Sequence, residues 1–226
     1  MPDPTSQSTG PITVAANAAK EYADLIVKGP LGELGGMLTD AIGQWRLRNQ
    51  VRLLLRTKDW LERKGVKPQL IRPDLFVPLV NAATDTSDEN LSDMFASLLA
   101  TQLDPETSEN SHPSYAGVLT QLSPIDAKAM VLFSEWVSHK EAREVGLPGP
   151  GITVEHVAQD LEISARVAHL SCLNLHRLGI TEHTGYSPPQ GHPTSVIFEH
   201  SPEHQRYRIT EYGVAFCQAC RYARAA

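Results

Sequence analysis

The sequence predicts a mostly α-helical protein, in which a helical N-terminal domain is followed by a C-terminal winged helix-turn-helix domain with a small β-sheet. Three observations predict this arrangement. Apolar residues recur at spacings of three and four over much of the first 145 residues. The run GLPGPG at residues 146–151 cannot continue a helix. After it, two short helical segments around a tight turn precede β-branched and aromatic runs, which is the order of a winged helix.

The N-terminal part begins with a tail and two helices. Residues 1–12 are rich in proline, serine and threonine, and we expect them to form a loose tail. An amphipathic helix is predicted over residues 13–28, and a longer one over residues 37–64. The apolar residues of the longer helix lie on one stripe: Leu47, Val51, Leu54 and Leu61.

Four further helices complete the predicted N-terminal domain, residues 13–145. Pro73 suits the first position of a helix, although Pro78 is expected to end or kink that helix. Thr86 and Glu89 have the spacing of a capping box for the next helix. A short helix and a longer one follow, and the linker 146–151 ends the domain.

The C-terminal domain is predicted over residues 152–226. Thr153 is expected to cap a short helix, and Ser164 a second helix that ends at Gly179. A final helix is expected behind Thr210. Strands are predicted at residues 180–186, 194–200 and 205–210.

Four stretches of the sequence together resemble the abortive-infection alpha family of bacterial phage-defence proteins. They are GPLGELGGMLTDAIGQWRLRN, SDENLSDMFASLLATQLD, HPSYAGVLTQLSPIDAKAMVLF and the tail LNLHRLGI…YRITEYGVAFCQAC. The resemblance covers about residues 20–220 and rests on the order of helix-packing patterns. It implies a role in abortive infection, in which an infected cell stops growing or dies before phage is released. It supplies no catalytic residues.

Charge is distributed unevenly along the chain. The net charge of −6 argues against a protein that coats nucleic acid through bulk charge. Residues 46–72, however, hold nine basic and two acidic residues, whereas residues 73–127 hold nine acidic residues and no lysine or arginine. Four arginines share a face of the long helix, and they form a candidate site for an anionic partner: Arg48, Arg52, Arg56 and Arg63.

A competing interpretation is a solvated basic face that pairs partly with the acidic segment of the same chain or of a second subunit. The adjacency and opposite sign of the two segments favour this interpretation. The Gly-rich run at residues 29–36 lacks the lysine and hydroxyl residue of a phosphate-binding loop, so a hinge or a close helix approach is favoured there.

The predicted winged helix offers residues that can contact nucleic acid. The second helix carries Arg166, His169, Asn174 and Arg177, and the wing carries Arg206 and Arg208. From residue 151 onward, however, six basic residues stand against seven acidic ones, which is weak for a DNA-binding domain. Winged helices also bind proteins, so the fold alone does not decide between these partners.

The three cysteines raise the question of a zinc site. Cys172 and His176 are four residues apart on one predicted helix, and Cys217 and Cys220 are three apart on another. The pattern lacks the turn that usually holds structural zinc, and buried, inert thiols are favoured. We therefore expect no metal and no cofactor.

The overall expectation is a non-enzymatic phage-defence protein that acts by binding a macromolecule. No catalytic motif is present, and the first residues lack the apolar core of a secretory signal, so a soluble, cytoplasmic protein is expected. The expected partner is a protein or phage component, with homo-oligomerisation also open. The alternatives are a winged-helix DNA-binding regulator and, third, a membrane-acting toxic effector.

Overall fold

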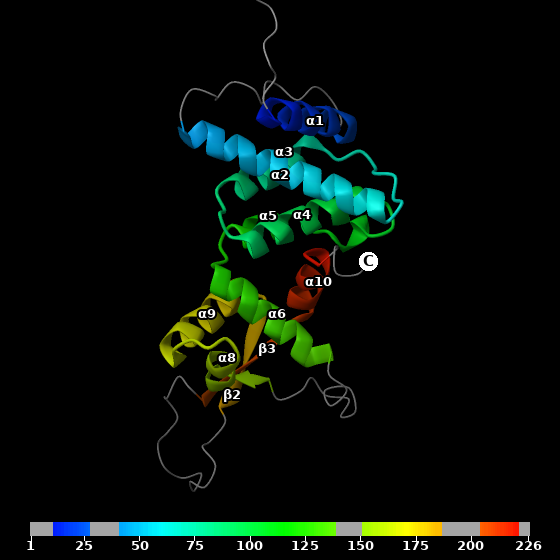
Figure 1. Cartoon of the computed structure of the whole chain (residues 1–226). Helices are drawn as coiled ribbons and strands as arrows, with labels where there is room; N and C mark the ends of the chain where they lie inside the picture. Colours follow the sequence, from blue (N-terminus) through cyan, green and yellow to red (C-terminus); the bar gives the residue numbers. More distant parts are fainter. Residues whose placement is uncertain (1–10, 28–40, 139–150, 187–203, 222–226) are drawn as a thin grey trace, which may run out of the picture. The chain divides into compact units, whose positions relative to one another are not determined.

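The structure, a computed structural model, describes residues 11–27, 41–138, 151–186 and 204–221. Most of these residues are helical, and three short strands form one antiparallel sheet (Figure 1). The prediction of a mostly helical protein is confirmed. The chain divides into two compact units. Unit 1 comprises residues 1–120 and 220–226, and unit 2 comprises residues 121–219.

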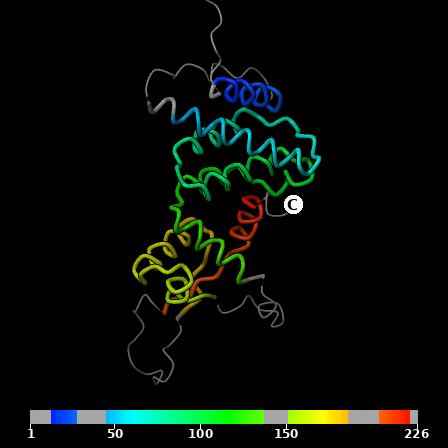
Figure 2. The backbone as a smooth tube through the Cα atoms, in the orientation of Figure 1, coloured from blue at the N-terminus to red at the C-terminus, as the bar shows by residue number. Residues whose placement is uncertain are grey.

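Unit 1 is built from helices. The helices are α1 (Pro11–Ile26), α2 (Ala41–Arg63), α3 (Pro73–Thr84), α4 (Glu89–Leu103), the 3₁₀ turn η1 (Ser108–Asn110) and α5 (Ser114–Leu119). After α2 the chain turns back, so that α3 lies beside α2 (Figure 2). The helix α2 also contacts α1 and α4, which places one of its faces toward the core and leaves another outside.

The core of unit 1 centres on α4. This helix is buried on almost every side, as expected for a central helix. Its buried positions hold mainly alanine, leucine and small hydroxyl residues. Leu54 and Leu61 of the predicted apolar stripe are buried, and Leu47 and Val51 are half-buried, so the stripe does face the core. The loop between α2 and α3 is fixed by backbone bonds: Gln69 N donates to Leu103 O at 2.8 Å, and Ile71 N donates to Ile26 O at 2.8 Å.

One local prediction in unit 1 was wrong, and a second was wrong in part. The helix α4 is capped by Asp88, whose carboxylate accepts from Leu91 N at 2.9 Å, and not by a Thr86–Glu89 capping box. Of the two outcomes expected at Pro78, the ending does not occur, because α3 continues to Thr84, and the kink stays a prediction. Proline removes the bond to the carbonyl four residues earlier, that of Asp74. Both residues are exposed, so water can reach that carbonyl.

Unit 2 combines helices with the sheet. Its elements are α6 (Pro124–Ser138), β1 (Ile152–Thr153), α8 (Val154–Asp160), α9 (Ala165–Arg177), β2 (Thr181–Tyr186), β3 (Gln205–Ile209) and α10 (Glu211–Ala219). The strand order is β1-β3-β2, and both pairings are antiparallel. The strands predicted at 180–186 and 205–210 are confirmed. The short strand β1 was not predicted, and the predicted strand 194–200 lies outside the described residues.

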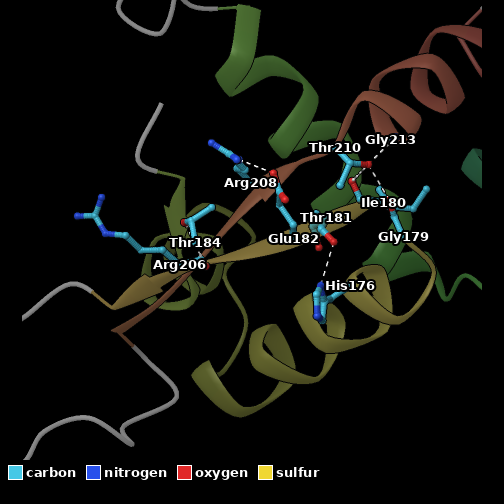
Figure 3. Close-up of polar contacts among 10 residues, drawn as sticks. All are labelled: His176, Gly179, Ile180, Thr181, Glu182, Thr184, Arg206, Arg208, Thr210 and Gly213. Carbon is cyan, nitrogen blue, oxygen red and sulfur yellow. Dashed lines mark hydrogen bonds and ion pairs between the residues drawn. The ribbon is translucent and has the colours of Figure 1, made fainter. Parts of the chain in front are cut away.

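The predicted caps of unit 2 are confirmed. Thr153 accepts from His156 N at 3.1 Å, and Ser164 accepts from Val167 N at 3.4 Å. Thr210 accepts from the amide of Gly213 at 2.9 Å while its hydroxyl reaches the carbonyl of Gly179 at 2.7 Å (Figure 3). The side chain of Thr210 thus links the turn at Gly179 to the start of α10.

The compact units divide the chain between residues 120 and 121, and α6 belongs with the C-terminal elements. The linker predicted at 146–151 and the Gly-rich run at 29–36 lie largely or wholly outside the described residues. The domain boundary predicted at that linker therefore stays a prediction. The first helix begins at Pro11, within the segment predicted as a tail.

Candidate functional site

The basic segment of residues 46–72 is partly neutralised within unit 1. Arg56 forms an ion pair with Asp93 of α4, and Arg46 pairs with Asp85 at 3.2 Å. Between them, the side chain of Asn49 donates to the carbonyl of Thr84 at 2.9 Å. Part of the basic segment thus pairs with the acidic segment of the same chain, which is the interpretation that the sequence favoured.

The other three arginines of the predicted anion site face outward. Arg48 and Arg52 are exposed, and their side chains make no hydrogen bond or ion pair with any described residue. Arg63 is also exposed, and its Nε donates to the backbone carbonyl of Asp59 at 3.2 Å. The sequence placed these three arginines in one site with Arg56. The structure distinguishes them, because only Arg56 pairs with a carboxylate of α4.

An aromatic residue that sequence reasoning missed lies on the same face. Trp45 is 36% exposed, and it precedes Arg48 and Arg52 by three and seven residues. Spacings of three and seven place all three on one side of a helix. The spacing was visible in the sequence, but the exposure was not. We name these three residues the α2 outer face.

The helix α9 of unit 2 is apolar on two sides. Its inner side buries Ala168, Ser171, Cys172 and Leu175. Its outer side exposes Val167, Leu170 and Leu173, with Leu170 57% exposed. We name these three residues the α9 apolar face. Sequence reasoning selected only the polar residues of this helix, although the spacing of three between the apolar ones could have identified the face.

Two polar residues of α9 are held by other groups of unit 2. The Nδ2 atom of Asn174 donates to the carboxylate of Asp126 at 2.9 Å and to the carbonyl of Gln121 at 3.0 Å. Arg177 donates to Asn174 Oδ1 at 2.8 Å and to Gln121 Oε1 at 3.0 Å. These partners of Arg177 are neutral, so its positive charge remains at the end of the α9 apolar face.

The other predicted contacts on α9 differ from each other. Arg166 is exposed beside the start of the α9 apolar face. His169 is half-buried, and its Nδ1 is buried without a hydrogen bond to any described residue. Among the residues predicted to contact nucleic acid on this helix, Arg166 and Arg177 therefore supply the outward positive charge.

The arginines predicted on the wing lie on β3. Arg208 pairs with Glu182 of β2 at 2.5 Å, which neutralises it across the strand pair (Figure 3). The side chain of Arg206 extends away from that pair, and its backbone carbonyl accepts from Thr184 at 3.5 Å. Both arginines therefore lie on the strand pair, but the charge of Arg208 is neutralised there by Glu182.

The cysteines are all buried and free. Burial first, and then the negative charge of Asp126, raises the pKa of Cys172 to about 12, so its thiol is protonated at neutral pH. The Sγ of Cys217 donates to the carbonyl of Met130 at 3.9 Å, and Nδ1 of His176 bonds to the carbonyl of Thr181 at 3.0 Å. No group of three or more potential metal ligands occurs in the part of the chain that the structure describes.

Helix length and hydropathy decide whether a helix can cross a membrane. Within the described ranges, none of the helices combines the length and apolar character that crossing a bilayer requires. Ala23 and Ile26 of α1 are buried in unit 1, whereas Val14 and Leu25 are 59% and 65% exposed on the same helix, which also exposes Glu21 and Asp24.

Comparison with known proteins gives one result. The model of the family described as abortive infection alpha matches residues 48–220. No curated protein and no solved structure matches the chain. The matched region contains α9 entirely and α2 from Arg48 onward, and it supports the resemblance noted in the sequence.

Proposed function

The chain belongs to the abortive infection alpha family, and on that premise we propose that it is a non-enzymatic phage-defence protein that acts by binding a protein partner. Family membership associates it with abortive infection. The binding mechanism rests on the surfaces described above. The proposed place of action is the cytoplasm, where an infecting phage exposes its components.

Unit 2 is proposed to be a winged-helix module. The order α6, β1, α8, α9, β2, β3 supports this, together with a three-stranded antiparallel sheet in which β3 is central. In such a module α9 takes the position of the recognition helix, and β2 with β3 forms the wing. A recognition helix that reads DNA presents polar side chains to the base edges.

The observation that carries the proposal is the outward exposure of the α9 apolar face. Val167, Leu170 and Leu173 occupy the side on which a DNA-reading helix would need polar residues. Apolar residues exposed together on one face are typical of protein-binding surfaces. Asn174 is meanwhile held by Asp126 and Gln121. These features favour a protein partner over DNA.

The charges around the α9 apolar face define the chemistry of that partner. Arg166 and Arg177 lie at its two ends, and neither forms an ion pair with a described carboxylate. A complementary partner surface has an apolar ridge with carboxylates at its ends. We propose a phage or host protein segment of this kind as the occupant, with a second copy of the chain as the competing outcome.

A phage challenge with a matched pair of variants tests the proposal. Leu170→Glu places a carboxylate on the α9 apolar face, whereas Leu70→Glu alters a comparably exposed leucine, 52% exposed, in unit 1. We expect Leu170→Glu to lose protection, measured as culture survival and phage yield, and Leu70→Glu to retain it. Circular dichroism and thermal melting of both variants show that each is folded. Full protection by folded Leu170→Glu would contradict the proposal.

Two further measurements address the alternatives. Sedimentation of the wild-type chain and of Leu170→Glu tests the second-copy outcome, because an oligomer through this face would dissociate in the variant. A gel shift with genomic fragments at physiological salt tests the regulator. Retention that is lost in Arg166→Glu would favour DNA, and it would overturn the choice of a protein partner.

A further inference from the structure

We propose that the α2 outer face binds single-stranded nucleic acid through a stacking tryptophan and two arginines. The face consists of Trp45, Arg48 and Arg52, all exposed on unit 1. It is independent of the α9 apolar face and of the protein partner proposed for it.

The arginines of this face are available to an external anion. Of the three other arginines of α2, Arg46 and Arg56 pair with Asp85 and Asp93. The acidic segment therefore neutralises part of α2 and leaves Arg48 and Arg52 without an ion pair among the described residues. An arginine guanidinium suits phosphate, because its donors form a rigid fork that matches two phosphate oxygens.

The tryptophan distinguishes among anionic partners. Bases in a duplex are stacked on each other, but those of a single strand are open to stacking on an aromatic ring. Trp45 is 36% exposed beside the arginines, which places an aromatic surface next to two phosphate-binding groups. Single-stranded binding sites combine these two elements.

A membrane surface fits this helix less well. An amphipathic helix binds a bilayer through its apolar face. The apolar residues of α2, including Leu53, Leu54 and Leu61, are buried in the core of unit 1, each at 5% exposure or less. The leucines and the valine of α2 are buried or half-buried among the described residues, so the helix presents mainly charge, together with Trp45, to an external partner.

Fluorescence anisotropy with the full chain and a labelled oligothymidylate of about 16 nucleotides tests the proposal. Two contacted phosphates on a single strand predict a salt slope of about −1.4. Raising the salt from about 50 to about 200 mM should then weaken binding about 7-fold. Salt-independent binding, or the absence of binding at the lower salt, would overturn the proposal.

Charge-matched variants locate the site. Arg48→Glu with Arg52→Glu reverses the two arginines of the face, and Lys20→Glu with Lys67→Glu makes the same change in net charge at exposed positions elsewhere. We expect the first pair to weaken binding at least about 10-fold and the second by less than about 2-fold. An equal loss in both pairs would show attraction to overall charge, contrary to the proposal.

The stacking role of Trp45 is tested separately. Trp45→Ala should weaken binding about 5-fold or more, since stacking of a single base contributes that much, and it should leave the salt slope unchanged. Trp45→Phe should retain most of the affinity because its ring can still stack. Binding to duplex DNA as tight as to the single strand, or to phosphatidylserine vesicles in place of both, would overturn the assignment.

Discussion

The hydroxyl of Ser171 on α9 donates a hydrogen bond of 2.6 Å to the buried carboxylate of Asp126 on α6. The same carboxylate accepts from the amide of Ser123 at 2.8 Å, and the Ser123 hydroxyl accepts from the amide of Asp126 at 3.2 Å. This reciprocal pair is a capping box at the start of α6. One acidic side chain thus both begins α6 and fixes the rotation of α9, and with it the direction of the α9 apolar face.

Loss of that carboxylate should destabilise unit 2. Asp126→Ala removes the acceptor for Ser171 and Asn174, which leaves buried donors unsatisfied, and we expect it to lower the free energy of unfolding by about 3 kcal/mol. Denaturant titration measures the change. Asp24→Ala, at an exposed position of α1, is the control and should change it by less than about 0.5 kcal/mol. Similar values for the two variants would contradict the role of Asp126.

The start of α10 lies close to the backbone at Ile180, and this contact predicts how substitutions at Gly213 change stability. A Cβ added to Gly213 would lie 2.2 Å from the carbonyl oxygen of Ile180, a backbone atom that cannot move aside alone. We expect Gly213→Ala to cost about 1–3 kcal/mol of stability, as overpacking does. Gly117 in α5 has nothing within 4 Å of such a Cβ, so Gly117→Ala should stabilise by about 0.4–1 kcal/mol. Thermal melting of both variants checks the opposite signs.

The buried Cys172 predicts a stability that falls at alkaline pH. Burial, with a smaller contribution from Asp126, raises the pKa of its thiol from 9.0 to about 12 in the folded state. Between these values the unfolded chain loses the proton and the folded chain keeps it. The stabilisation is therefore complete below about pH 9 and is lost as the pH rises toward 12.

Denaturant titrations across that pH range check this, with Cys172→Ala as the comparison. Burial also raises the pKa of Tyr207, and the tyrosine adds a decline of the same sign. The variant should therefore show a shallower decline rather than none. A slope identical to that of the wild-type protein would contradict the contribution of Cys172.

The ion pair between Arg56 and Asp93 should contribute little to stability. The two side chains are 30% and 49% exposed, so solvent screens the pair and limits its coupling energy to about 0.2–1 kcal/mol. A double-mutant cycle with Arg56→Gln and Asp93→Asn measures it. Arg52→Gln, which lacks such a partner among the described residues, should be neutral within about 0.5 kcal/mol. A coupling well above this range would show that the pair is better shielded than its exposure indicates.

The sequence predicted those features that are encoded locally. Thr153, Ser164 and Thr210 were predicted as caps because a hydroxyl and an amide three residues later suffice for a cap. The short strand β1 was missed because two residues carry no detectable alternation. Ile152 joins the sheet only through its pairing with Tyr207, far along the chain.

The candidate surfaces were only partly predictable. The spacing of Arg48, Arg52 and Arg56 placed them on one face, but their separation into paired and exposed arginines depends on where Asp93 of α4 lies. In the same way, Leu170 and Leu175 are both apolar residues of α9, and only the packing of the helix decides that Leu175 is buried and Leu170 is exposed. Contacts between residues far apart in the sequence decide these features, and the local periodicity of the sequence does not predict such contacts.

The division of the α2 arginines into paired and unpaired ones, among the described residues, predicts which positions change together in related sequences. Because Arg56 meets Asp93, a change of sign at one position leaves a like-charged pair unless the other changes as well, so these two positions should covary. Arg48 and Arg52 have no such counterpart among the described residues. If they covary with anything, it will be with the composition of the molecule that each relative binds.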